Sequence, residues 1–188
     1  MSENSPAYTI GCLVGSVSQP SLNRRLAGAL ARLAPRAGLE FRDIPIGHLA
    51  FYGNQMDDAY PQVGWDLKNA VSDVDGLLLV TPEYNRSIPA VLKNAIDWMS
   101  RPKGKSSFTN KPTGVIGTSK GTVSTAVAQA HLKSILASQG APLVGSPEAY
   151  IRYTEGLVDD DGQVTDESTE KFLVEFLLSL HDLVRRWV

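Results

Sequence analysis

Residues 76–98 read GLLLVTPEYNRSIPAVLKNAIDW, and this stretch decides the fold class. The apolar run 76–80 is typical of a buried strand. The polar turn Pro82-Glu83-Tyr84-Asn85 follows it, and a helical spacing of apolar residues then begins. An aromatic ring and exposed backbone amides are therefore expected at the carboxyl end of a strand. In an open α/β sheet, this is where a flat ligand binds.

Strand-like and helix-like segments alternate along the rest of the chain. We expect strands at 8–14, 39–44, 76–80, 113–117 and 142–145, with a resumption of the last at 149–151. We expect helices from 22 to about 35, and at 66–72, 88–99, 123–138 and 166–187, with Ser87 as the cap of the third. This series predicts an α/β chain with a three-layer flavodoxin-like fold, whose five-stranded parallel sheet has the order 2-1-3-4-5. Because no repeat or linker interrupts the series, residues 1–188 are expected to form one domain.

The composition is that of a soluble globular protein, with 188 residues, 43% hydrophobic and 20% charged, and a formal net charge of -2. The charge argues against a nucleic-acid partner, which would require a basic stripe. No apolar run approaches the roughly 20 residues that span a membrane. The start, MSENSPAY, lacks the features of a signal peptide, so we expect a cytoplasmic protein. Cys12, the single cysteine, lies in an apolar run and is expected to be buried and inert.

The loop at 15–23, Gly-Ser-Val-Ser-Gln-Pro-Ser-Leu-Asn, contains the first cluster of candidate ligand-binding groups. It combines three hydroxyls with the unpaired N–H groups of a helix start, which together suit a phosphate. It is neither a Walker A loop nor a GxGxxG fingerprint. A serine-rich helix cap without a ligand explains the same residues, so both interpretations stay open.

Two further loops are expected at the same edge of the sheet. Tyr84, in the turn 82–85, can cover one face of a planar ligand, or the turn can be purely geometric with an exposed ring. The loop 117–122, Gly-Thr-Ser-Lys-Gly-Thr, adds a wall of small residues. Together the three loops fit a mononucleotide with a flat ring.

These residues resemble the NADPH-dependent FMN reductase family, the flavodoxin-like quinone and chromate reductases. The resemblance covers nearly the whole chain and is most specific in the Pro-Glu-Tyr-Asn loop and the Leu-Lys-Asn-Ala-Ile-Asp-Trp helix of residues 82–98. It implies non-covalent FMN as the cofactor. The residues implied to bind FMN are Ser16, Ser18, Gln19, Ser21 and Asn23 around the phosphate, and Pro82, Glu83, Tyr84, Asn85 and Ser119 around the ring system.

This chain departs from the family pattern at a few positions. The family often has an arginine where this chain has Ser18, and arginine is the stronger phosphate partner. FMN is therefore expected to bind more weakly here unless Arg24 or Arg25 compensates. Val127 and Ala130 stand where some relatives have an arginine and a tyrosine at subunit contacts.

The implied activity is a two-electron reduction in which NADPH or NADH passes a hydride to the flavin. A small-molecule acceptor, such as a quinone, chromate, an azo compound or free flavin, then takes the electrons. The flavin carries the chemistry, so no catalytic side chain is needed. The sequence agrees, because no nucleophilic triad or metal cluster is apparent. A flavodoxin-like electron carrier, or a flavin-binding module without its own NAD(P)H activity, is the alternative.

The sequence also offers expectations about partners and charge. Trp98 and Met99 exceed what one core needs, which favours a homodimer, with a homotetramer as the alternative. The irregular segment 45–64, with Phe51, Tyr52 and Tyr60, is a candidate to reach over a partner's flavin. Arg86 and Arg101 are candidates for the NADPH phosphate, with surface charge as the alternative role.

Overall fold

A computed structural model describes residues 8–188 of the chain. The start of the sequence, on which the expectation about a signal peptide rests, lies largely outside the described residues. Five parallel strands form one sheet in the order β2-β1-β3-β4-β5, which confirms the flavodoxin-like order. The strands are β1 (Tyr8–Val14), β2 (Leu39–Asp43), β3 (Gly76–Val80), β4 (Thr113–Ser119) and β5 (Ala149–Arg152).

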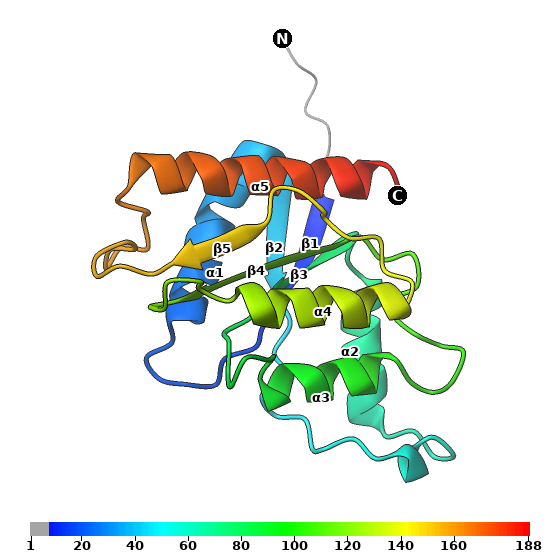
Figure 1. Ribbon diagram of the computed structural model, residues 1–188. Coiled ribbons are helices and arrows are strands. Elements are labelled where there is room, and N and C mark those ends of the chain that lie inside the picture. Colours follow the sequence, from blue (N-terminus) through cyan, green and yellow to red (C-terminus); the bar gives the residue numbers. More distant parts are fainter. Residues whose placement is uncertain (1–7) are drawn as a thin grey trace.

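Helices cover both faces of the sheet, as Figure 1 shows. They are α1 (Leu22–Leu33), α2 (Gln62–Ser72), α3 (Ala90–Met99), α4 (Ala126–Ser138) and α5 (Glu167–Arg185), with short 3₁₀ turns η1 (Ala34–Ala37) and η2 (Asn54–Met56). α1 and α5 pack on one face against Ile10, Cys12 and Val14, while α2, α3 and α4 pack on the other. None of the helices in residues 8–188 combines the length and apolar character needed to cross a bilayer.

The ends of the first and last helices follow local signals in the sequence. Ser21 caps α1 by accepting a hydrogen bond from Arg24 N, and Asp166 caps α5 by accepting one from Thr169 N. Gly38 ends the η1 turn in the left-handed conformation, with φ of 67°. At the edge where the strands end, Gly117 lies so close to Thr81 that a Cβ would sit 2.0 Å from the Thr81 carbonyl oxygen. Only glycine permits this approach of β4 to the loop after β3.

Several boundaries differ from those expected. The fifth strand is 149–152 and not 142–145, because Leu143 makes only an isolated bridge to Thr113 before the chain bends at 146–147. α2 starts at Gln62 and α4 at Ala126. Ser87 does not cap α3, because its backbone pairs with Tyr84 in a tight turn and the helix starts only after Pro89.

Trp98 and Met99 belong to the core of a single chain. Their exposed fractions are 1% and 0%, and the Tyr52 and Tyr60 rings pack edge-on against Trp98 at 5.6 and 5.4 Å. The expectation that these side chains exceed one core was wrong. Phe51 differs from its neighbours, because 81% of its surface is exposed.

Candidate functional site

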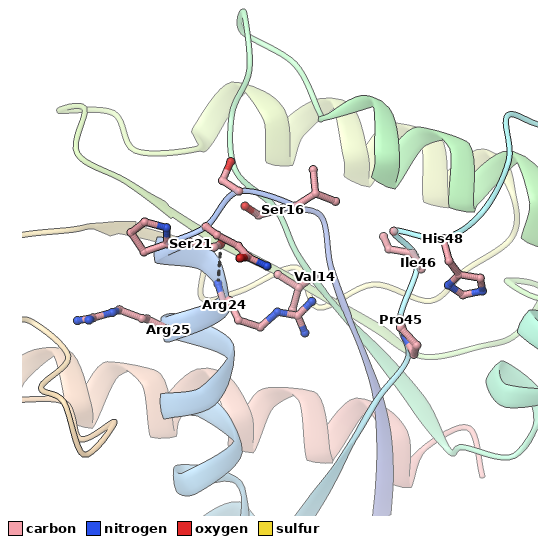
Figure 2. Close-up of a pocket in the computed structure, with 13 residues that line it drawn as sticks. Val14, Ser16, Ser21, Arg24, Arg25, Pro45, Ile46 and His48 are labelled. Carbon is pink, nitrogen blue, oxygen red and sulfur yellow. Dashed lines mark hydrogen bonds between the residues drawn. The ribbon is translucent and has the colours of Figure 1, made fainter.

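A cavity of about 660 Å³ lies at the carboxyl ends of β1 and β2 (Figure 2). The loop after β1 and the segment after β2 form its walls. The lining residues are Val14, Ser16, Val17, Ser18, Gln19, Pro20, Ser21, Arg24, Arg25, Pro45, Ile46, Gly47 and His48. The volume is typical of a site for a cofactor-sized ligand. Four of the residues expected to bind FMN, Ser16, Ser18, Gln19 and Ser21, therefore share one cavity.

The loop that borders this cavity presents free hydrogen-bond donors. Within residues 8–188, no acceptor pairs with the backbone N–H groups of Ser16, Val17, Ser18 or Gln19. These groups lie beside the N-terminus of α1, where the helix dipole favours negative charge. None of the lining residues is acidic. The arrangement suits a phosphate group.

Two arginines at the start of α1 line the cavity but point in different directions. Figure 2 shows Arg24 extending beneath the loop toward the Pro45–His48 segment, while Arg25 points to the other side. Asp43, the last residue of β2, holds Arg24 with an Nη1–Oδ1 distance of 2.9 Å. Arg25 instead approaches Asp160 at 3.7 Å. Arg24 is therefore the better placed of the two cations to meet an anion in the cavity.

Tyr84 connects the turn after β3 to the cavity loop. Its hydroxyl lies 3.2 Å from Ser18 Oγ, so the second loop meets the first. Tyr84 and Ser87 exchange two backbone hydrogen bonds across Asn85 and Arg86, which have φ of 49° and 63°. Two consecutive left-handed residues define a tight hairpin turn, in which asparagine is readily accommodated and Arg86 is strained. Such strain concentrates at functional sites.

The side chain of Glu83 faces α4. Its Oε2 accepts a hydrogen bond from Ala128 N at 3.0 Å, and its Oε1 pairs with Arg86 Nη1 at 3.2 Å. Thr125 at the start of α4 provides no side-chain cap, so Glu83 satisfies an open N–H group of that helix from another loop. The carboxylate therefore joins the turn after β3 to α4.

Asn23 and Ser119 hold backbone in place. The buried amide of Asn23 makes two hydrogen bonds of 3.0 Å with the backbone of Thr118, through Oδ1 and Nδ2. Ser119 Oγ donates to Ser124 O and accepts from Gly121 N. Asn23 therefore links the start of α1 to the end of β4, and Ser119 shapes the loop after β4. Both contribute to the site by fixing its loops.

The structure brings the expected residues together only in part. Ser16, Ser18, Gln19 and Ser21 line the cavity, and Tyr84 touches Ser18. The other expected residues are not among those that line it: Asn23, Pro82, Glu83, Asn85 and Ser119. Arg101 lies at the far end of α3, paired with Asp57. Segment 45–64 was expected to reach over a partner's flavin, and sequence reasoning missed that residues 45–48 form a wall of the cavity in the same chain.

The other reactive side chains stay apart from this site. Cys12 is buried, as expected. Burial raises the pKa of its thiol to about 12, with Asp43 adding to the shift, which disfavours the reactive thiolate. His131 Nδ1 lies 3.2 Å from Ser87 Oγ on the exposed side of α4. Within residues 8–188, no group of three or more His, Cys, Asp or Glu side chains is arranged to hold a metal.

The fold is that of a flavodoxin-like protein, and the cavity at its β1 loop suits a phosphate-bearing ligand. The sequence of residues 8–156 matches the model of the NADPH-dependent FMN reductase family, and the chain belongs to this family. It is an oxidoreductase that uses FMN, with NAD(P)H as co-substrate. The residues present fit this cofactor, because unpaired amides, hydroxyls and an arginine surround a cavity without acidic groups.

Several known proteins are similar over almost their whole length. A 2-hydroxy-1,4-benzoquinone reductase of a Burkholderia species is 44% identical over 182 residues, 97% of either chain. A quinone reductase of Pseudomonas putida is 37% identical, over 98% of this chain and 96% of the relative. Among solved structures, FerB, a flavoenzyme NAD(P)H:(acceptor) oxidoreductase from Paracoccus denitrificans, superposes with a TM-score of 0.90. It shares 41% identity over 96% of this chain and 98% of its own.

Proposed function

We propose that this protein is an NAD(P)H:quinone oxidoreductase that works through FMN. The observation that supports this most strongly is the cavity at the β1 loop, where unpaired amides and Arg24 converge without any acidic residue. The named activities of the similar proteins, which include two quinone reductases, support a quinone as the acceptor.

The β1 loop is the proposed phosphate site. The amides of residues 16–19 and the hydroxyls of Ser16, Ser18 and Ser21 bind the phosphate oxygens, and Arg24 supplies the positive charge. Asp43 orients Arg24 through its 2.9 Å ion pair. A charged donor strengthens such bonds about twofold over neutral ones.

The turn after β3 is the proposed wall for the ring system. Pro82, Tyr84 and Asn85 lie beside the ring, with backbone amides available to its polar edge. Glu83 contributes indirectly, because it ties this turn to α4. When bound, FMN supplies hydride acceptance and electron release, and the protein orients the partners and excludes side reactions.

A panel of acceptors tests the choice of substrate. FMN-loaded protein and NADPH are mixed with 2-hydroxy-1,4-benzoquinone, simple 1,4-benzoquinones, chromate, an azo dye or free FMN. We expect the quinones to give the highest kcat/KM. If chromate, an azo dye or free FMN exceeds every quinone, the proposed acceptor is wrong while the flavin site stands.

We also propose a homodimer that buries Phe51. The neighbours of Phe51 are fixed, since Ala50 O accepts a hydrogen bond from Trp98 Nε1 and Tyr52 N donates one to Asn94 Oδ1. Phe51 is 81% exposed between two fixed residues, and aromatic side chains are enriched in protein–protein interfaces, which supports a subunit contact at this position. Light scattering should give a dimer mass for the natural protein and a monomer mass for Phe51→Asp. A monodisperse monomer of the natural protein would contradict the proposal.

A further inference from the structure

A second cavity, of about 330 Å³, opens where the strands begin, at the edge of the sheet opposite the proposed flavin site. It lies between the second half of α2 and the segment 105–111, which leads into β4. Three lysines, Lys68, Lys105 and Lys111, line it together with Trp65, Asn69 and Ser107. No lining residue is acidic.

Lys68 forms a fixed wall of this cavity. Only 8% of the residue is exposed, and its ammonium group donates to the carbonyl oxygens of Met99 and Lys105 and to Ser107 Oγ. Since the end of α3 carries partial negative charge, the contact with Met99 explains why a lysine is tolerated there. It does not explain why two more lysines gather beside it.

Within residues 8–188, none of the three lysines forms an ion pair with a carboxylate. Among the described residues, lysine ion pairs occur only at Lys93 and Lys133. Lys105 instead lies over the Trp65 ring, with its Nζ 5.4 Å from the ring centre, and Lys111 donates to Val74 O. Asp75 acts on Lys111 from outside the cavity, where its carboxylate accepts a hydrogen bond from Thr9 N. Burial, followed by repulsion from Lys105, lowers the pKa of Lys68 to about 8.

Free donors accompany these charges. Ser107 Oγ accepts a hydrogen bond from Lys68, so its own hydroxyl proton stays available as a donor. The ammonium group of Lys111 has three N–H donors, and among the described residues only one of them is used, in the hydrogen bond to Val74 O. Like charges in close proximity repel each other unless an anion or solvent offsets them.

We propose that this cavity binds a phosphate-type oxyanion, held by Lys105, Lys111 and Ser107. The proposal does not depend on the proposed function, because the two cavities share no lining residue.

Equilibrium dialysis of the FMN-saturated protein against labelled inorganic phosphate, at constant ionic strength, tests this site. FMN occupies the β1 loop, so the uptake reports the second cavity. Lys105→Glu puts a carboxylate among the lysines and should weaken phosphate binding at least about tenfold. Lys103→Glu is the matched control, since Lys103 is exposed two residues before Lys105 and does not line this cavity. Equal loss in both variants, or no uptake by the natural protein, would overturn the proposal.

Thermal unfolding provides a second measurement. Phosphate at ten times its dissociation constant should raise the midpoint of the natural protein by roughly 3 °C. Without phosphate, Lys105→Glu should melt above the natural protein, because the new carboxylate replaces the anion, and Lys103→Glu should not. Competition of AMP with labelled phosphate separates two sources of the oxyanion. If AMP binds more tightly than phosphate, the ligand is a nucleotide, and if AMP binds more weakly, the ligand is free phosphate. A Lys105→Glu variant that melts below Lys103→Glu would contradict the charge argument.

Discussion

Arg24 is the residue on which the proposed phosphate site depends most. Ser18 occupies the position where the family often has an arginine, and the structure directs Arg24, but not Arg25, toward the cavity beneath the same loop. The choice between the two arginines was open in the sequence. The direction of the Arg24 side chain depends on Asp43, and Asp43 lies beside Arg24 because β2 pairs with β1.

We expect Arg24→Ala to weaken FMN binding about tenfold, because a charged hydrogen bond to the phosphate is lost. Riboflavin lacks the phosphate, so its affinity should be the same in the natural protein and the variant. Quenching of flavin fluorescence measures both dissociation constants. Arg25→Ala is the matched control and should change FMN affinity much less. Equal effects of the two substitutions, or an equal loss for riboflavin, would refute the assignment of Arg24.

Cys12 gives a pH dependence whose sign can be stated. Burial raises the pKa of its thiol from 9.0 to about 12, so the folded state holds this proton more tightly than the unfolded chain. The contribution to stability is complete below pH 9 and is lost as the pH rises toward 12. We expect Cys12→Ala to show a smaller fall in the free energy of unfolding than the natural protein between pH 9 and pH 10, measured by urea unfolding.

Tyrosines set the upper limit of that pH window. The pKa values of Tyr60 and Tyr150 are raised from 10.0 to about 12, so they add a loss of stability above pH 10 in both proteins. If the free energy of unfolding falls equally with pH in the natural protein and in Cys12→Ala below pH 10, burial does not raise the pKa of the thiol.

At the scale of elements, the contact between Glu83 and α4 is the feature that most shapes the site. Glu83→Ala removes the partner of Ala128 N and should lower the free energy of unfolding by about 1–2 kcal/mol. Glu83→Gln keeps a hydrogen-bond acceptor and loses only the charge, so its free energy of unfolding should lie between those of the natural protein and Glu83→Ala. Denaturant unfolding provides the measurement. A Gln variant as unstable as the Ala variant would mean that the hydrogen bond contributes nothing.

Element boundaries were predictable where the signal was local. The first and last helices were expected at 22 to about 35 and at 166–187, and they are observed at Leu22–Leu33 and Glu167–Arg185. Asp166 is the cap of α5 and not its first residue. The start of α3 was misjudged because Ser87, two residues before Pro89, looks like a helix cap, whereas its backbone is already paired with Tyr84 in the tight turn. β5 was misjudged because an apolar run does not reveal whether it continues along its neighbour, and residues 142–144 contact only the start of β4.

At the scale of the whole molecule, the sheet order was predictable because alternating strands and helices with right-handed crossovers leave few topologies. The loops after β1 and β3 therefore had to lie at the same edge, and Ser18 meets Tyr84 there. The cavity wall formed by Pro45 to His48 was not predictable, since it depends on where β2 ends in space relative to β1. The burial of Trp98 under Tyr52 and Tyr60 likewise depends on how segment 45–61 crosses α3.

The central claim is that this chain holds FMN and reduces it with NAD(P)H. The most direct measurement is the visible absorption of the FMN-loaded protein after anaerobic addition of NADPH or NADH. We predict rapid bleaching of the oxidised flavin and return of the colour when a quinone is added. Bound flavin that keeps its colour would mark an electron carrier, and a protein that takes up no FMN would contradict the account altogether.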